Sequence, residues 1–184
     1  MAKKRKFCAY RKLERAYTRK SKFKKKSFVR SSPQVKIVKF DMGNLTKKDW
    51  QYKLELISKD DLQIRDNAFE SARQLSNKFF ETKIGKENYH FRIKAFPHHM
   101  LRENPLASGA GADRMSTGMK MSFGKVIGIA ARIYKGKTII EVETDKEFVE
   151  RVKIGLIKAS KKLPGSCTIQ VKELKPVKKT AVAA

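Results

Sequence analysis

The chain has 184 residues, and its 44 Lys and Arg against 18 Asp and Glu give a formal net charge of +26. A hydrophobic fraction of 40% supports a folded core and excludes a chain that is disordered throughout. A charge this large favours a polyanionic partner, and at this length we expect one core. No stretch is apolar for long enough to span a membrane, and no signal peptide is recognisable, so we expect a cytoplasmic protein without a membrane partner.

The positive charge is concentrated in residues 1–34, which we expect to form a basic arm. Residues 1–30 contain 14 basic side chains and one acid, Glu14, and six of the cations fall within residues 19–26. Their mutual repulsion opposes compact local structure. Aromatic residues are interleaved with them, and aromatic rings stack on bases while cations neutralise phosphates. The arm therefore predicts nucleic-acid binding. The alternatives are a flexible tail that keeps the protein soluble and a segment that binds an anionic membrane surface. The arm has no amphipathic period, which disfavours membrane binding.

Residues 35–172 predict a single α+β domain, followed by a flexible basic tail over 173–184. The predicted fold class is a mixed, mainly antiparallel sheet with two principal helices packed on one face. Alternating or β-rich segments predict strands, in chain order, at residues 35–40, 51–58, 88–96, 126–134, 137–144 and 167–171. Asp41 to Asn44 is interpreted as a turn, and Lys135-Gly136 as the turn of a hairpin.

Two segments with helical periodicity lie between these strands. The first covers residues 66–82, with Gly85 as a stop, and its predicted buried stripe is Ala68, Ala72, Leu75 and Phe79. The second begins at a capping-box pattern formed by Thr144 and Glu147 and ends at Pro164-Gly165. Its predicted buried stripe is Phe148, Val152, Leu156, Ala159 and Leu163.

Residues 97–125 form a connection far longer than the roughly 4 to 6 residues that are typical, and such length usually serves a function. Gly109-Ala110-Gly111 lacks the third glycine of a dinucleotide-binding turn, because Arg114 stands in its place. We therefore expect no cofactor. Small residues among cations instead favour close approach to a phosphate backbone, and Asp113 is interpreted as the cap of a short helix that ends near Met121. The alternative is a surface insert without a ligand.

Several side chains are candidates for catalysis or metal binding. His98 and His99 are adjacent, so they cannot both point at one metal from a regular strand, and no third ligand stands at a recognisable spacing. Cys8 and Cys167 match neither a disulfide framework nor a zinc site. No nucleophile, base and orienting group occur together, so we expect no catalytic residues, no metal and no enzymatic activity.

The residues predicted to contact nucleic acid fall into two groups. In the strand at 88–96 and the segment after it, basic side chains share the face opposite the apolar residues or stand at the ends of the long loop: His90, Arg92, Lys94, His98, His99 and Lys125. In the arm they are Lys3, Lys4, Arg5, Lys6, Tyr10, Arg11, Arg15, Tyr17, Arg19, Lys20, Lys22, Lys24, Lys25, Lys26 and Arg30.

Six short stretches of the sequence are the most distinctive: residues 36–44, 64–68, 89–93, 97–99, 109–114 and 117–125. Together they resemble the large-subunit ribosomal proteins of the universal sixteen family in its archaeal and eukaryotic form. The resemblance covers residues 5–172. Asp41-Met42-Gly43-Asn44 and Pro97-His98-His99 are closer to archaeal members.

The resemblance implies a two-layer α+β fold on large-subunit rRNA, between the central protuberance and the peptidyl transferase region. It also implies neighbouring ribosomal proteins and tRNA at the A and P sites as partners, a place in the cytoplasmic large subunit, no enzymatic activity and no homo-oligomer. The long loop is similar to the family's segment that reaches toward the P site. The residues it makes candidates for proximity to tRNA are Arg102, Ser108, Gly109, Ala110, Gly111, Ala112, Asp113, Arg114 and Lys120.

Two other functions are compatible with parts of the sequence. A chromatin-like or general nucleic-acid-binding protein is favoured by charge alone and predicts equal affinity for duplex DNA and rRNA. An RNA-modifying enzyme or nuclease is disfavoured by the absence of a catalytic set. The leading hypothesis is a structural rRNA-binding protein whose arm threads into rRNA and whose loop stabilises rRNA that faces tRNA.

Overall fold

The computed structural model describes residues 5–18, 22–23, 25, 29, 32–104, 109–111, 114 and 124–174. No helix in this part is long and apolar enough to span a membrane. Its helices are α1 (Asp66–Lys83) and α3 (Val149–Ser160), with short 3-10 turns η1 (Phe7–Tyr10), η3 (Lys86–Asn88) and η4 (Lys146–Phe148). Its strands are β1 (Asp41–Gly43), β2 (Tyr52–Ser58), β3 (Leu62–Arg65), β4 (Tyr89–Ile93), β5 (His99–Glu103), β6 (Lys125–Ile133), β7 (Thr138–Thr144) and β8 (Cys167–Glu173).

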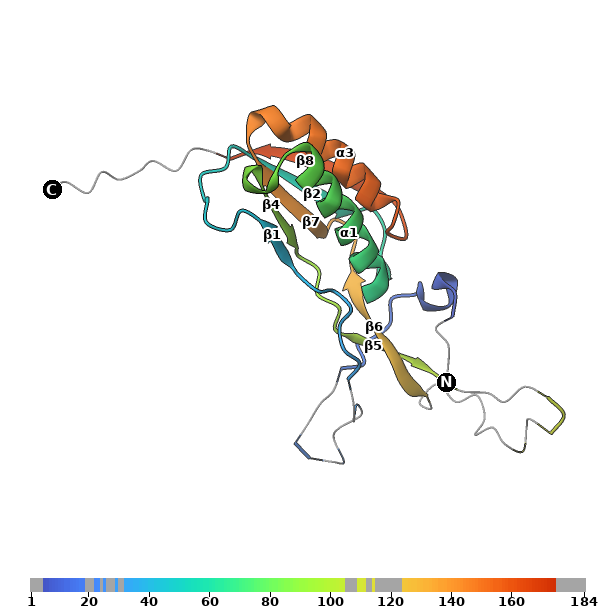
Figure 1. Ribbon diagram of the computed structural model, residues 1–184. Coiled ribbons are helices and arrows are strands. Elements are labelled where there is room, and N and C mark those ends of the chain that lie inside the picture. The colour runs from blue at the N-terminus through green and yellow to red at the C-terminus, as the bar shows by residue number, and fades with distance from the viewer. Residues whose placement is uncertain are drawn as a thin grey trace.

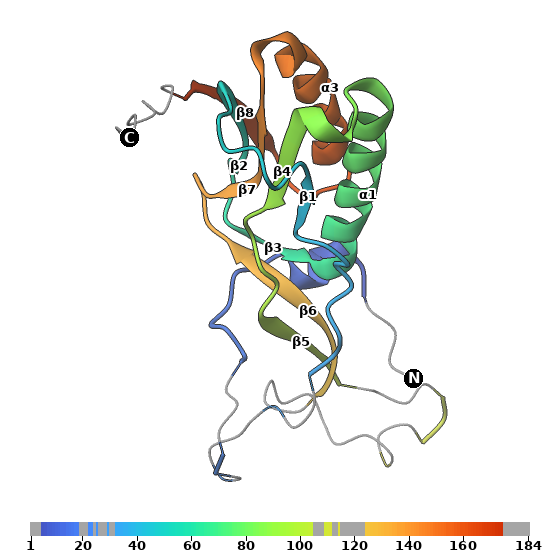
Figure 2. The same ribbon diagram turned by 60° about the vertical axis from the view of Figure 1, so that its left-hand side comes forward.

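The strands form two antiparallel sheets. The larger sheet has the order β1-β4-β7-β2-β8, and the smaller has the order β3-β6-β5. Helices α1 and α3 lie against one face of the larger sheet, and the smaller sheet extends away from the lower end of α1 (Figures 1 and 2). The predicted α+β fold class, with a mainly antiparallel sheet and two helices on one face, is confirmed.

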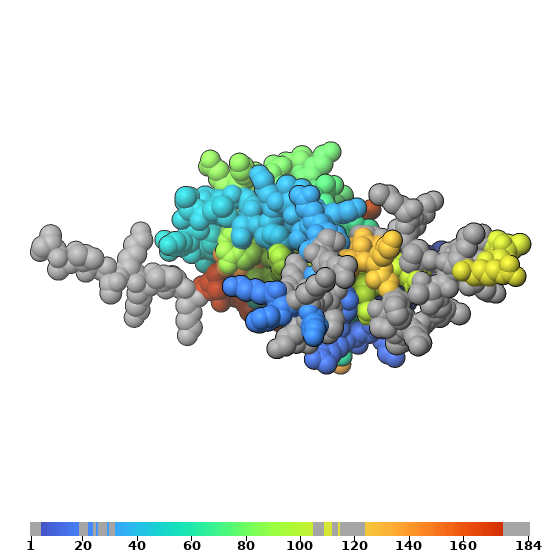
Figure 3. All heavy atoms as spheres, turned by 90° about the horizontal axis from the view of Figure 1, so that it is seen from below, coloured from blue at the N-terminus to red at the C-terminus, as the bar shows by residue number. Residues whose placement is uncertain are grey.

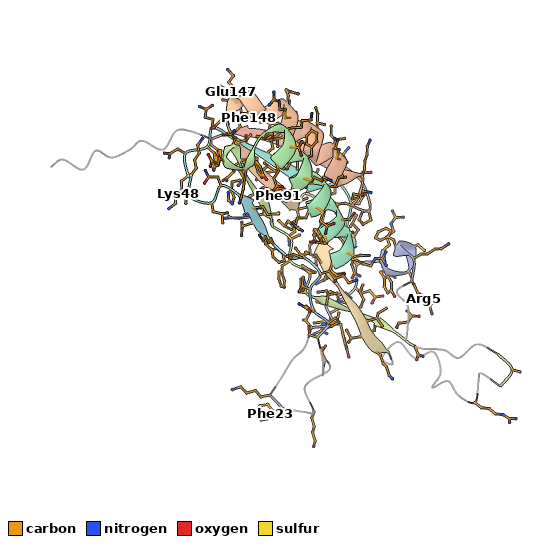
Figure 4. All side chains as sticks on the ribbon, in the orientation of Figure 1. Arg5, Phe23, Lys48, Phe91, Glu147 and Phe148 are labelled. Atoms are coloured by element: carbon orange, nitrogen blue, oxygen red, sulfur yellow. The ribbon has the colours of Figure 1, made fainter. Side chains whose placement is uncertain are left out.

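The main core lies between the two helices and the larger sheet. The ring of Phe80 on α1 lies 5.4 Å from that of Tyr89 and 5.8 Å from that of Phe91, and all three side chains are fully buried. Figure 4 shows Phe91 within this layer. The predicted inward face of the strand at 88–96 is confirmed, since Tyr89, Phe91, Ile93 and Ala95 are all buried.

The predicted strand at 35–40 is wrong, and so is the predicted turn at 41–44. Residues 35–40 contain no strand, and the ladder with β4 runs through Asp41–Gly43. Gly43 has a φ of 87° and lies so close to Tyr89 that a Cβ atom would overlap the Tyr89 carbonyl oxygen. The reversal comes directly afterwards, where Asn44 Oδ1 accepts hydrogen bonds from the Thr46 and Lys47 amides. The predicted turn therefore comes too early in the chain, because β1 occupies its first three residues.

Strands β6 and β7 occur where they were predicted, but the hairpin between them is wrong. A turn does join them, because the Lys137 amide donates to the Tyr134 carbonyl and Gly136 has a φ of 81°. However, the Gly136 amide donates to the Ser58 carbonyl, and the Ser58 amide donates to the Lys137 carbonyl. The two strands therefore separate, and each joins a different sheet.

Besides β1, two strands were not predicted, β3 and β5, and β5 lies inside the predicted long loop. In β5, His99, Met100 and Leu101 are buried in succession, so this strand has no alternation for sequence reasoning to find. Glu103 at its end pairs with Lys125 at the start of β6. The long connection thus narrows to residues 104–124, which leave and return at one end of the smaller sheet.

Both predicted helices are present, with different details. In α1 the buried stripe is Phe69, Ala72, Ser76 and Phe80, whereas Leu75 is 38% exposed. The predicted stripe is thus confirmed at Ala72 and displaced by one residue at its other positions. The capping box is wrong, because Thr144 belongs to β7 and its hydroxyl donates to the Asn88 carbonyl at 3.0 Å. The predicted inner stripe of the second helix is confirmed at Val152, Leu156, Ala159 and Leu163, although α3 ends at Ser160.

The contact between the two helices gives the first prediction. A Cβ atom on Gly155 of α3 would overlap the fully buried ring of Phe80. We expect Gly155→Ala to lower the free energy of unfolding by about 1–2 kcal/mol, because overpacking outweighs the gain in helix propensity of about 1 kcal/mol. Urea unfolding followed by circular dichroism measures this change. In a Phe80→Leu background the same substitution should stabilise the protein; stabilisation in both backgrounds would contradict the proposed clash.

Candidate nucleic-acid interface

A charged surface covers the face of the larger sheet that is turned away from the helices. The predicted side chains His90 and Arg92 of β4, and Lys94 directly after this strand, lie on this face, each beside an acid of a neighbouring strand. Arg92 bonds to Asp41, Lys94 lies 3.4 Å from Glu141, and His90 Nδ1 lies 3.1 Å from Glu143. The structure therefore brings the three predicted residues together, within a network of ion pairs. We call it the charged sheet face.

Two further cations of the charged sheet face were missed by sequence reasoning. Lys53 of β2 lies 2.8 Å from Glu141, and Lys172 of β8 lies 2.7 Å from Glu55. The alternation in β2 already placed Lys53 and Glu55 on the outward face, which was the available signal. Their place on the same face as the β4 cations depends on the strand order, which puts β7 between β4 and β2, and β8 at the edge beyond β2.

The acids of the charged sheet face lie beneath its cations. The Glu141 side chain is 4% exposed and that of Glu55 is 10% exposed, whereas those of Lys94 and Lys172 are 43% and 54% exposed. Burial by itself would raise the pKa of Glu141, but the hydrogen bond and charge of Lys53, with those of Lys94, outweigh it and lower that pKa. The Glu141 carboxylate therefore stays ionised, and the contacts with Glu141 and Glu55 hold the cations of this face in fixed positions. Their half-exposed ammonium and guanidinium groups remain accessible to phosphate.

The beginning of the arm is docked against the smaller sheet. Arg5 forms an ion pair with Glu103 of β5, and the Tyr10 hydroxyl donates to the same carboxylate at 3.3 Å. Arg65 at the end of β3 donates to the Arg5 carbonyl at 2.9 Å. Figure 4 labels Arg5 at this end of the molecule, far from Glu147 and Phe148 at the other. These contacts tie arm residues of the predicted interface to the start of the long loop.

A second group of contacts holds the arm at Tyr17. The Tyr17 amide donates to His99 Nδ1 at 2.9 Å, and the Met100 amide donates to the Tyr17 carbonyl at 3.2 Å. The Arg102 guanidinium lies 3.9 Å from the centre of the Tyr17 ring, within the range of a cation–π interaction. Figure 3 views this end from below, with the blue N-terminal residues beside the orange residues of β6. Predicted rRNA and tRNA residues thus meet in one cluster.

His99 is a buried neutral histidine in this cluster. Its pKa is lowered to about 4, first by burial and then by the positive charges of Arg132, His98 and Arg102. Because Nδ1 accepts the Tyr17 amide, the proton of the neutral ring is on Nε2. His99 therefore acts in positioning the arm, whereas His98 is exposed.

The remaining predicted residues are either exposed in the structure or lie outside the residues that it describes. Those exposed in the structure are Lys6, Arg11, Arg15, Lys22, Lys25, Gly109, Ala110, Gly111, Arg114 and Lys125. Those outside the described residues are Lys3, Lys4, Arg19, Lys20, Lys24, Lys26, Arg30, Ser108, Ala112, Asp113 and Lys120. The short helix predicted after Asp113 lies outside them too, apart from Arg114. Within the described ranges, no three His, Cys, Asp or Glu side chains are grouped as metal ligands.

Comparison with known proteins identifies the family. Residues 15–170 match the family described as Ribosomal protein L16p/L10e. The chain belongs to this family. Its members are structural, non-enzymatic components of the ribosome, so the expected absence of enzymatic activity is confirmed by membership.

Proteins named "Large ribosomal subunit protein uL16" are similar over most of their length. The one from Staphylothermus marinus is 45% identical over 84% of this chain and 88% of its own length. The one from Methanococcus aeolicus is 45% identical over 88% of this chain and 90% of its own. The one from Nanoarchaeum equitans is 40% identical over 99% of this chain and 100% of its own. The resemblance to archaeal L16p/L10e proteins is confirmed.

The docking of the arm gives the second prediction. His99→Leu removes the acceptor of the Tyr17 amide, so amide hydrogen exchange over residues 5–18 should accelerate about tenfold at pH 7. His98→Leu is the matched control and should leave exchange unchanged. Because the docked state holds the pKa of His99 near 4, protonation favours release. Protection, corrected for intrinsic rates, should be full above pH 6.5 and fall toward pH 4. Equal exchange in both variants would contradict this role of His99.

Proposed function

We propose that this protein is a structural constituent of the large ribosomal subunit that binds large-subunit rRNA near the peptidyl transferase region and lies close to tRNA at the A and P sites. Membership of the L16p/L10e family supports the ribosomal role. The observation that carries rRNA binding is the charged sheet face, where buried carboxylates hold half-exposed cations in an ordered array. Phosphate contacts of this kind fix the position of a protein on RNA without reading its sequence.

The arm adds to this surface from the opposite end of the molecule. Its docked residues present exposed cations such as Arg11 and Arg15 beside the smaller sheet. With 14 basic residues among the first 30, the arm supplies a large part of the positive charge available to rRNA. The rRNA contacts therefore divide between the sheet face, which sets orientation, and the arm, which neutralises phosphates.

Proximity to tRNA is assigned to the long connection. Residues 104–124 begin and end at the tip of the β5–β6 ladder, where Glu103 faces Lys125. Figure 2 shows β5 and β6 at the far end from α3. The docked arm braces the residue directly before this connection, because Arg5 forms an ion pair with Glu103.

The third prediction tests rRNA binding. If about ten cations each neutralise one phosphate, affinity for large-subunit rRNA should fall with a log–log salt slope of about −7 to −9. The double variant Arg92→Gln, Lys94→Gln should reduce the magnitude of that slope by about 1–2. Filter binding across a potassium chloride series measures it.

A matched control carries the same charge change elsewhere. Lys161→Gln with Lys162→Gln alters two exposed cations after α3 and should change the slope less. A slope near zero for the unaltered chain would contradict rRNA binding. Equal affinity for duplex DNA would favour general nucleic-acid binding instead.

The fourth prediction tests the loop. Deleting residues 108–120 should leave the domain folded and able to bind rRNA, because the β5–β6 ladder lies outside the deletion. Subunits rebuilt with this variant should be impaired in tRNA-dependent steps, measured as tRNA binding to the P site and peptide-bond formation. If rRNA binding is lost while assembled subunits translate normally, proximity to tRNA is contradicted.

A further inference from the structure

A cavity of about 320 Å³ lies between the docked arm and the smaller sheet. Arg5, Ala9, Tyr10 and Lys12 line it from the arm, and Gln63 of β3 with residues 99–103 of β5 lines it from the sheet. This volume is at the small end of the roughly 300–1,000 Å³ of ligand pockets, which fits one nucleotide and excludes a duplex. The cavity unites residues that the sequence assigned separately to rRNA and to tRNA.

We propose that this cavity receives a single rRNA nucleotide that is turned out of its stack. The inference rests on the proposed function, because it takes rRNA as the partner, and it adds the place where one base is held. Proteins that recognise RNA by sequence mostly bind unstacked bases of loops and bulges, through aromatic or guanidinium stacking and hydrogen bonds to base edges.

The strongest support is an unsatisfied buried amide. Gln63 is 3% exposed, and its Nε2 donates to the Lys12 carbonyl, which fixes the orientation of the side chain. Its Oε1 is buried without a hydrogen-bond partner among the described residues. Buried carbonyl oxygens are rarely left unpaired, so this acceptor requires a donor, which a water supplies in the free protein and a ligand supplies when it displaces that water. The amino group of a base is such a donor.

His99 narrows the choice of base. It lines the same cavity, and its neutral ring carries the proton on Nε2, because Nδ1 accepts the Tyr17 amide. An acceptor at Gln63 and a donor at His99 match a base edge on which an amino group stands beside an unprotonated ring nitrogen. Adenine and cytosine have this arrangement on their Watson–Crick edge, whereas guanine is protonated at N1 on that edge and uracil has no amino group. The cavity is therefore assigned to an adenine or a cytosine.

The other lining groups suit the rest of a nucleotide. Tyr10 offers an aromatic ring for stacking, and Lys12 and Arg102 supply positive charge for the phosphate. Two carboxylates also line the cavity, Glu14 and Glu103. Glu103 is already engaged by Arg5 and by the Tyr10 hydroxyl, so its charge is compensated. A free nucleoside monophosphate offers the same chemistry as an rRNA nucleotide, and the experiment separates the two.

The experiment uses large subunits stripped of this protein and rebuilt with the full chain. Dimethyl sulfate methylates exposed adenine N1 and cytosine N3, the ring nitrogens that His99 would cover. Two variants disturb the cavity differently: Gln63→Met removes the acceptor at similar length, and Ala9→Trp fills the space while Gln63 stays. Gln170→Met, at an exposed position of β8, and Ala9→Ser are the matched controls.

We expect one adenine or cytosine to be protected with the unaltered chain and both controls. It should become about tenfold or more reactive with both cavity variants, while co-sedimentation with the subunit is unchanged. If the unaltered chain joins the subunit but no adenine or cytosine responds to both variants, the inference is overturned and the proposed function stands. If the unaltered chain does not join the subunit, the proposed function falls and the inference falls with it. Binding of free AMP or CMP to the isolated chain, without protection in subunits, overturns the assignment to rRNA.

Discussion

Repulsion between like charges is the constraint on which the rest of this structure depends. The chain carries 44 basic residues and 18 acidic ones, so its carboxylates cannot compensate its cations one for one. The structure places several carboxylates where they compensate the charge of nearby cations most strongly. Glu141 and Glu55 lie beneath the cations of the charged sheet face, and Glu103 holds Arg5 of the arm. In low-dielectric positions a buried carboxylate interacts more strongly with a cation than an exposed one does.

This placement separates two kinds of cation. Those above buried acids, such as Lys94 and Lys172, have fixed positions because their counter-charges are part of the sheet. The cations of the arm, such as Arg11 and Arg15, are exposed. The arm around them is held by the Tyr10 hydroxyl and the Tyr17 amide. A fixed array suits orientation on a rigid RNA surface, and exposed cations suit neutralisation of phosphates over a wider area. Both properties fit a structural ribosomal protein.

The smaller sheet connects these functions. Strand β5 contacts the arm through His99, Met100 and Glu103, and its end leads directly into the long connection. The base of that connection is thus held by β6 on one side and by the arm on the other. A displacement of the docked arm would therefore reach Arg102 and Glu103, the residues directly before the connection. The cavity assigned to a nucleotide lies at this junction.

Local patterns in the sequence determined the charge distribution, the fold class, the alternation of β2 and β4, the inner face of α3 and the family resemblance. These are properties of neighbouring residues, so period and composition were sufficient. Only the tertiary structure decided the partners of each strand. Ser58 separates β6 from β7, and the burial of three successive residues conceals β5, because distant residues of the arm, Tyr17 and Val29, pack against it. The sequence did not single out Gln63 for the same reason. Its amide oxygen is an unpaired acceptor only because segments that are distant in the sequence pack around it.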